Sequence, residues 1–503
     1  MNLSTVVRSK ANLLLYAAYL TICMEDRAWS FCVSLCMQAL GGMRMVSIEQ
    51  FAEGIGQMIL SGHLGRQFDR VSRKFAILTV VPVNNINITL AATAFIVCMS
   101  VQPYSPWFTS FLVLGIAACA VNRLFLNAEK SLLSRDWLVV ISSDETLSSL
   151  NATFTALDQL TNVISPIIIL VTACGLRVTC AIFGAFGIVS MLMKAFLLRV
   201  FFIRTPLLAV KNQKVEVNQN LVISSPIWRK IVAVVTSTSN VLQTYGRQSV
   251  VAAAFAMALL FMTVMGFDGV NFQGVFRRLM TFGIPSHKSY GSAMGILGAL
   301  LYALFERRFG VRKSGLLGLT CQQFCLVAAV ISIWLPGSPF DPKKYFYNET
   351  IKESWFQMNQ TFSDGNIASS GSLQNMNRLL STGNDLDNMT SILTFLSGIA
   401  TARFGLWMAD LSIIHIMQEG VPESDRNTVF GVHNALCQTF SVLKDVLVII
   451  LPDPSTFGIC ILISYSFVTS GYLSFIYYLI KHPPSRNRQS TTHDNNEQQH
   501  TYL

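Results

Sequence analysis

The feature that most constrains this chain is a succession of long apolar stretches, each about the length of one membrane crossing. A helix needs roughly 20 apolar residues to cross a bilayer, because every backbone N–H and C=O must be satisfied within the segment. The chain is 52% hydrophobic and 13% charged over 503 residues, which is too apolar for an ordinary soluble protein. We therefore expect an all-α polytopic membrane protein in a lipid bilayer.

The apolar stretches are arranged as six, a linker and six more. They cover residues 12–38, 48–65, 75–100, 107–130, 147–173, 177–202, 247–272, 288–305, 314–335, 389–417, 426–451 and 456–480. Six spans on each side of a linker are typical of the major facilitator architecture. The predicted parts are an N-terminal half at 1–203, a cytosolic linker at 204–246, a C-terminal half at 247–482 and a disordered tail at 483–503.

Short basic loops lie on one side of this twelve-span arrangement. They are residues 65–74, 204–230, 306–313 and 481–488. Because basic loops stay in the cytosol, we expect both termini to be cytosolic. The formal net charge of +10 comes mostly from these loops, so it does not indicate nucleic-acid binding.

The hydrophilic insert at 337–388 falls on the opposite side and is expected to be extracellular. It contains three N-x-S/T sequons, at Asn348, Asn359 and Asn388, which would be glycosylated there. The plasma membrane is the expected location, since the chain shows no retrieval ending for another compartment.

The loop after the second stretch carries the ordered motif Gly65-x-x-x-Asp69-Arg70-x-x-Arg73. It resembles the loop between the second and third helices of major facilitator transporters. The glycine permits a tight turn, while the charged side chains can bind the facing half in one conformation only, which biases a two-state gate. Residues 306–313 hold a degraded echo of this motif, as expected if the second half repeats the first.

Further short motifs follow one another along nearly the whole chain. They are Asp26-Arg27-x-Trp29, Arg135-Asp136-Trp137, Asn151-Ala152-Thr153, Asp158-Gln159-Leu160-Thr161-Asn162, Gly266-Phe267-Asp268, Ala402-Arg403-x-Gly405-Leu406-Trp407-x-x-Asp410 and Glu423-Ser424-Asp425-Arg426. In this order they resemble the ferroportins, the iron exporters of the major facilitator superfamily. The resemblance implies export of ferrous iron, with cobalt, zinc or manganese as further substrates, by alternating access with counter-movement of protons. We expect a monomer without a cofactor, for which the metal is substrate.

The metal ligands that the resemblance implies are mostly replaced in this chain. In the first half they would be Asp26 and the residue four positions later, which is Ser30. In the second half they would stand at Gly269 and Lys444. Three of the four positions therefore lack the imidazole or thiolate that borderline divalent metals prefer. Gly269 also replaces a cysteine that contacts the peptide hormone hepcidin, which argues against hepcidin binding.

The calcium site that the resemblance implies is changed as well. Gly187 and Lys194 stand at two of its positions. Asp26 and Asn84 are the residues that are left for calcium.

Residues on one face of the eleventh stretch offer replacement ligands. His433, Cys437 and Lys444 are 4 and 7 residues apart, so they share a helix face. His433 and Cys437 can form a displaced soft-ligand pair, with Asp268 as a third partner. Alternatively, His433 bonds a carbonyl and Cys437 packs as a small apolar residue.

The first stretch permits a similar replacement. Cys23, Asp26 and Ser30 are 3 and 4 residues apart, so Cys23 can stand in for the missing histidine. Asp26 is either a metal ligand or a member of an ion pair with Arg27 or with a charge of another span. The eleven cysteines as a set are irregularly spaced, and we interpret them as small buried residues, not as a disulfide framework.

The remaining charged motif residues are expected to form gate salt bridges and hydrogen bonds. They are Asp69, Arg70, Arg73, Asp136, Asp158, Arg403, Asp410 and Arg426. Thr155 stands where the family has a fifth-span gate arginine, so the inner gate must differ from the family's.

Three functions stay open from the sequence. The first is a divergent ferroportin-type metal exporter. The second is a paralogue that moves an anion or a metal chelate, which Lys194 and Lys444 would favour. The third is a non-transporting receptor, although a receptor has no need of the gate residues. The sequence has no P-loop, zinc-protease helix motif or serine elbow, so we do not expect an enzyme.

Overall fold

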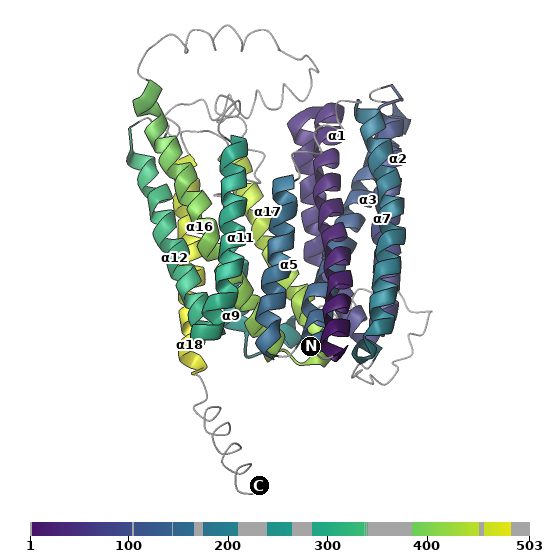
Figure 1. Ribbon diagram of the computed structural model, residues 1–503. Helices are drawn as coiled ribbons and strands as arrows, with labels where there is room; N and C mark the ends of the chain where they lie inside the picture. The colour runs from purple at the N-terminus through teal and green to yellow at the C-terminus, as the bar shows by residue number, and fades with distance from the viewer. Residues whose placement is uncertain are drawn as a thin grey trace, which may run out of the picture.

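The computed structural model describes residues 3–102, 105–142, 144–164, 175–209, 239–263, 284–336, 338, 340, 385–451 and 457–483. The regular elements within these ranges are all helical, and they stand roughly side by side as a bundle (Figure 1). The predicted all-α class is therefore confirmed.

Helix α1 (Leu3–Arg70) folds back on itself and supplies the first two predicted stretches. Arg123 of α3 (Pro106–Ser131) forms ion pairs with both Asp26 and Glu53. On a straight helix these two acidic residues would lie roughly 40 Å apart. The chain therefore reverses between them, and the two limbs of α1 lie against the same face of α3.

The other helices of the first half are short to medium in length. They are α2 (Arg73–Cys98), the π-helical segment η1 (Leu132–Trp137), α4 (Leu138–Ile141), α5 (Asp144–Ile164), α7 (Leu176–Arg204) and the 3₁₀ turn η3 (Pro206–Ala209). Capping residues in the sequence determine where α2 and α3 begin. Ser72 and Ser105 accept hydrogen bonds from the backbone of the first turns of α2 and α3, and Pro106 suits the first helical position of α3.

The second half is built from the remaining helices. They are α9 (Val251–Leu260), α11 (Ile284–Phe309), α12 (Val311–Ile331), η4 (Ser332–Trp334), α16 (Asp385–Gly420), η5 (Glu423–Asp425), α17 (Arg426–Ile450) and α18 (Phe457–Lys481). Gly310 has a φ of 81°, a conformation that glycine adopts without steric cost. This residue lets α11 and α12 adjoin through a tight turn.

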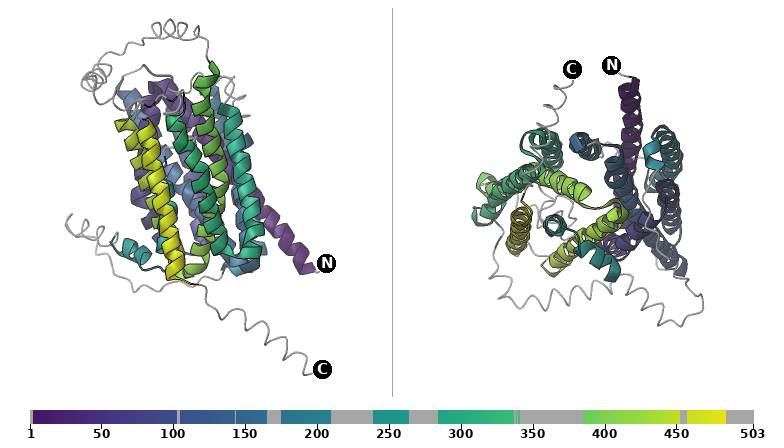
Figure 2. Two further views of the ribbon diagram at one scale, coloured as in Figure 1. Left: turned by 90° about the vertical axis from the view of Figure 1, so that its left-hand side faces the viewer. Right: turned by 90° about the horizontal axis from the view of Figure 1, so that it is seen from below.

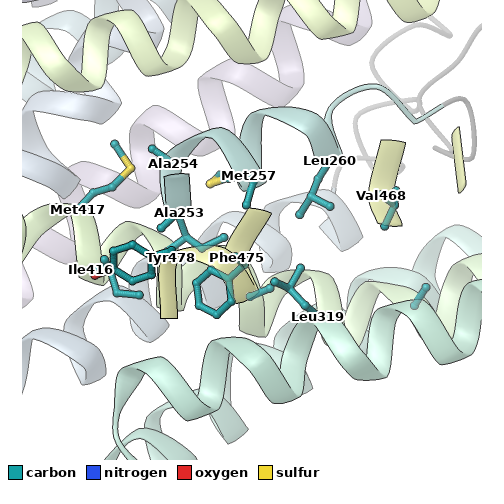
Figure 3. Packing of buried hydrophobic residues seen from close by; sticks show 14 of the residues in the cluster. Ala253, Ala254, Met257, Leu260, Leu319, Ile416, Met417, Val468, Phe475 and Tyr478 are labelled. Carbon is teal, nitrogen blue, oxygen red and sulfur yellow. The ribbon is translucent and has the colours of Figure 1, made fainter. Parts of the chain in front are cut away.

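The apolar core of the second half is centred on α9 (Figure 3). Ala253 and Ala254 let neighbouring helices approach, while Phe475 of α18 and Leu319 of α12 fill the space beside them. All four side chains are almost completely buried. This packing fixes α16 and α18 around α9, and with them the second-half side of the interface.

The two halves meet along two pairs of helices. The helix α1 packs along α17, and α5 packs along α11. In the view from below, the purple-to-blue and green-to-yellow helices form two adjoining groups (Figure 2). This arrangement of two halves is typical of proteins that rock about a midplane site.

The predicted stretches each overlap a described helix or a limb of α1. Within the described residues, six helices are long and apolar enough to cross a membrane. Among the others, α9 is apolar but only 10 residues long, and α17 carries Lys444 and Asp445. Twelve crossings and cytosolic termini stay predictions. Most of the linker at 204–246, the insert at 337–388 and the tail at 483–503 lie outside the described residues.

Candidate functional site

A cavity of about 230 Å³ lies between the two halves. Its first-half wall includes Lys130, Arg135 and Asp158, and its second-half wall includes Trp407 and Asp410. Charged side chains are costly in the middle of a membrane protein and mark solute pathways. The cavity is therefore the candidate site for a transported solute.

In the π-helical segment η1, the neighbouring side chains of Arg135 and Asp136 point to different sites. Arg135 lines the cavity and lies 4.9 Å from the Phe430 ring centroid. Asp136 is fully buried and accepts a 3.0 Å hydrogen bond from Arg73 Nε. A π-bulge inserts an extra residue into a helix and is frequent at functional sites. Here it supplies one charge to the cavity and the next to the contact between α2 and η1.

Asp26 lies in a compact group of charges beside the cavity. Its carboxylate pairs with Arg123 and, at 2.7 Å, with Lys130 Nζ. Arg27 pairs instead with Asp158, at 3.1 Å. Lys130 also reaches Asp158 at 3.3 Å, so a single cation joins both carboxylates. In this conformation Asp26 is an ion-pair partner of α3, and its role as a metal ligand stays a prediction.

A second buried charge group lies deeper in the first half. Lys194 Nζ sits 3.1 Å from Glu25 and 3.2 Å from Glu129, and all three side chains are almost fully buried. Asn84 donates a hydrogen bond to each carboxylate. Lys194 is therefore an internal counter-ion, and it offers no free positive charge to an anion in this structure.

Asp69 joins the two halves through four hydrogen bonds. Its carboxylate accepts hydrogen bonds from the backbone N–H groups of Asn427 and Thr428, at 3.1 and 2.7 Å, and from both of their side chains. These N–H groups belong to the first turn of α17 and have no partner within their own helix. Asp425, the residue before α17, makes no such cap. A carboxylate of the first half thus caps a helix of the second half.

Arg73 adds an ion-pair group beside this cap. It bonds Asp136 of its own half and Glu423 of the other half. Arg426 approaches Asp136 to 3.6 Å. We call Asp69, Arg73 and their partners Asp136, Glu423, Arg426, Asn427 and Thr428 the inner gate. The end of the bundle where it lies, with the beginning of α1, is the inner end.

Two more cross-half contacts lie at the inner end. Ser148 of α5 donates to Glu306 of α11 at 2.7 Å. Asn151 of α5 donates to Gln418 of α16 at 2.6 Å. The Glu306 contact engages the degraded echo motif of residues 306–313. These polar contacts can be broken and remade without exposing an apolar core, which suits a gate.

The inner gate is expected to respond to pH through Asp69, which lies beyond the second predicted stretch. Burial raises the pKa of Asp69 to about 6, although the hydrogen bonds from α17 oppose that effect. A carboxyl group with a raised pKa binds a proton on closure. The closed form therefore gains stability as the pH falls through 6 and loses it as the pH rises. Between pH 7.5 and 5.5 the closed-to-open ratio should rise about fourfold.

The measurement is the distance between spin labels on Gln67 and Glu419, two exposed residues at the inner end. The Asp69→Asn variant should lose the pH response over this range, because residue 69 no longer titrates. An equal response in the variant would assign it to another group.

The predicted soft-ligand pair is brought together. Cys437 Sγ lies 3.6 Å from His433 Nε2, and both side chains are buried. His433 Nδ1 has no hydrogen-bond partner among the described residues. The cavity lining includes Phe430, Gly431 and Asn434 of the same helix but not these two residues. The pair therefore lies on a helix of the cavity wall, and its metal role stays a prediction.

The other predicted site residues are placed as follows. Asp268 and Gly269 lie outside the described residues, as do Asn348 and Asn359, and the side chain of Asn388 is not described. Lys444 pairs with Asp445 at 3.3 Å. Cys23 is buried, and Ser30 donates to Asp26 at 3.3 Å. Arg70 ends α1, and Arg403 lies on α16.

Sequence reasoning missed the partners of Asp26 and Lys194. Arg123, Glu129 and Lys130 all lie on the predicted stretch at 107–130 or at its end. Charged residues in an apolar stretch need opposite charges from other spans. Pairing these three charged residues with Glu25 and Asp26 would have predicted both buried charge groups.

Two helical halves, an interfacial cavity with charged walls and a polar gate define a membrane transporter of the major facilitator type. The sequence profile described as Ferroportin1 (FPN1) matches residues 9–468, so this chain belongs to the ferroportin family. Ferroportin of Rattus norvegicus is 27% identical over 94% of this chain and 92% of its own length. The resemblance predicted from the motifs is thereby confirmed.

Solved structures support the same fold. The crystal structure of a bacterial homologue of the iron transporter ferroportin in the outward-facing state matches with a TM-score of 0.70 at 17% identity, covering 93% of this chain and 99% of that one. The proton:xylose symporter XylE of the major facilitator superfamily matches with a TM-score of 0.58 at 10% identity, covering 95% and 96%.

Proposed function

We propose that this chain exports a divalent metal ion, with ferrous iron as the first substrate to test, by alternating access of the cavity between its halves. The observation that carries the proposal is the cap of α17 by Asp69. This contact joins the halves only when the inner end is closed, so it stabilises one of two states. Family membership supports iron as the substrate.

His433 and Cys437 are proposed as second-half ligands of the metal. An imidazole nitrogen and a thiol sulfur 3.6 Å apart suit borderline divalent ions such as ferrous iron and cobalt. Asp410, a carboxylate of the cavity wall, is the residue that we propose to complete the site. The anion alternative is less well supported, because Lys194 is neutralised by Glu25 and Glu129.

The test is efflux of labelled ferrous and cobalt ions from proteoliposomes. We expect efflux from the unaltered chain and an efflux rate at least about tenfold lower in His433→Ala and in Cys437→Ala. Mutating even the groups that hydrogen-bond to a metal ligand typically costs about 10- to 100-fold in activity, and loss of the ligand itself should cost no less. The matched control is Cys460→Ala, a buried cysteine of α18, which should keep its efflux.

Two outcomes would count against this proposal. Metal efflux that survives both variants would move the ligands elsewhere in the cavity. No metal efflux from the correctly folded chain, with transport of an anion or a metal chelate, would establish the second function instead. Proton coupling, a monomeric state and the plasma membrane stay predictions from the sequence.

A further inference from the structure

A group of three cysteines lies apart from the cavity, in the first half. Cys32 and Cys36 stand one turn apart on the first limb of α1, and Cys180 lies one turn after the beginning of α7. All three side chains have no exposed surface. They belong to neither the cavity wall nor the inner gate.

The three sulfur atoms form a triangle of the size that one metal ion requires. The Cys32 Sγ lies 4.0 Å from Cys36 Sγ and 3.9 Å from Cys180 Sγ. Sulfur atoms at about 2.3 Å from a central ion, the usual metal–thiolate distance, would be about 4.0 Å apart in a planar triangle. The third side, Cys36 to Cys180, measures 3.0 Å and needs to widen by about 1 Å on binding.

The triangle belongs to a buried apolar cluster that is rich in sulfur. The same buried cluster contains Cys98, Cys119 and Met37, with Met45 and Met99 packed against it. Within the described residues, the only His, Cys, Asp or Glu ligand atoms that gather here are the three thiols. Soft thiolate and thioether ligands select soft ions such as Cu(I). Zn²⁺ prefers a fourth ligand in a tetrahedron.

We propose that Cys32, Cys36 and Cys180 form a trigonal binding site for one soft monovalent metal ion of the Cu(I) class. Each thiol that becomes a ligand releases its proton. The bound ion fastens the first limb of α1 to α7 within one half. It therefore leaves the movement of the two halves against each other free. This site is separate from the substrate site of the proposed export function.

The probe is Cu(I), titrated without oxygen into the purified full-length chain against a Cu(I)-specific chelator. We expect one ion per chain, with three sulfur neighbours at about 2.3 Å by X-ray absorption. Cys32→Ser and Cys180→Ser should each weaken Cu(I) binding more than about 100-fold. Mutating even the groups that hydrogen-bond to a metal ligand lowers metal affinity about 10- to 100-fold. Cys98→Ser is the matched control in the same cluster and should bind as the unaltered chain does.

Three outcomes would overturn the proposal, provided that thermal unfolding shows each variant to be folded. The first is Cu(I) binding that is equal in all variants. The second is a Cys36 to Cys180 disulfide in the native chain, detected by mass spectrometry, with no Cu(I) binding after its reduction. The third is a site with nitrogen or oxygen neighbours. None of these measurements depends on iron transport. The Cu(I) site can therefore be tested even if the chain does not export iron.

Discussion

Gly65→Ala should lower the transport rate about 5- to 150-fold and hold the inner end open. An added Cβ on Gly65 would lie 2.8 Å from the carbonyl carbon of Asn427, and closer still to its oxygen. These are backbone atoms of the residue that Asp69 caps, so they cannot move aside without breaking the cap. Overpacking of this kind typically costs about 1–3 kcal/mol, which is a factor of about 5 to 150 in the closed-to-open ratio.

The control for this change is Gly56→Ala on the same limb of α1. A Cβ there would meet its nearest neighbour, Ala120 Cβ, at 3.9 Å, which is an ordinary contact. Spin labels on Gln67 and Glu419 should report a longer inner-end distance in Gly65→Ala alone. A closed inner end in Gly65→Ala would show that Asn427 does not define the gate.

Lys194→Met should destabilise the chain by about 3–5 kcal/mol, the usual cost of removing one partner from a buried ion pair. The change removes the lysine counter-ion of the buried carboxyl groups of Glu25 and Glu129. The measurement is thermal or denaturant unfolding of the purified chain. Arg199→Met removes the same charge from an exposed position of the same helix, and should change stability by no more than about 0.5 kcal/mol.

A combined variant separates charge from packing at this group. Replacing Glu25 and Glu129 by Gln together with Lys194→Met removes all three charges while nearly keeping the volumes. It should recover most of the lost stability, since replacing a whole buried charge group is often close to neutral. A combined variant as unstable as Lys194→Met alone would assign the loss to the shape of the lysine and not to its charge.

The sequence was sufficient for the membrane class and the order of the helices. Long apolar stretches depend on local composition, and they overlap the described helices throughout. The two separate stretches at 12–38 and 48–65 predicted the reversal of α1, and Gly41 and Gly42 lie between them. The π-helical segment at Arg135 and Asp136 was missed, since no residue type marks such a bulge.

The site was predictable in part. The Asp69 motif indicated a gate, but its hydrogen-bond donor Asn427 lies 358 residues later in the chain, and a single sequence carries no signal of that pairing. The Cys32, Cys36 and Cys180 group was interpreted as separate buried residues, because Cys180 is 144 residues from Cys36. In contrast, His433 and Cys437 share one helix, and helical periodicity alone brought them together.

If metal crosses the membrane as the inner gate opens and closes, blocking the gate must slow transport without removing the metal site. Uptake of labelled ferrous iron into inside-out proteoliposomes is followed beside equilibrium iron binding, for the unaltered chain and for Gly65→Ala. We expect uptake by the unaltered chain, and in Gly65→Ala retained binding with uptake slowed about 5- to 150-fold. Uptake by Gly65→Ala at the unaltered rate, or neither binding nor uptake by the folded unaltered chain, would contradict this expectation.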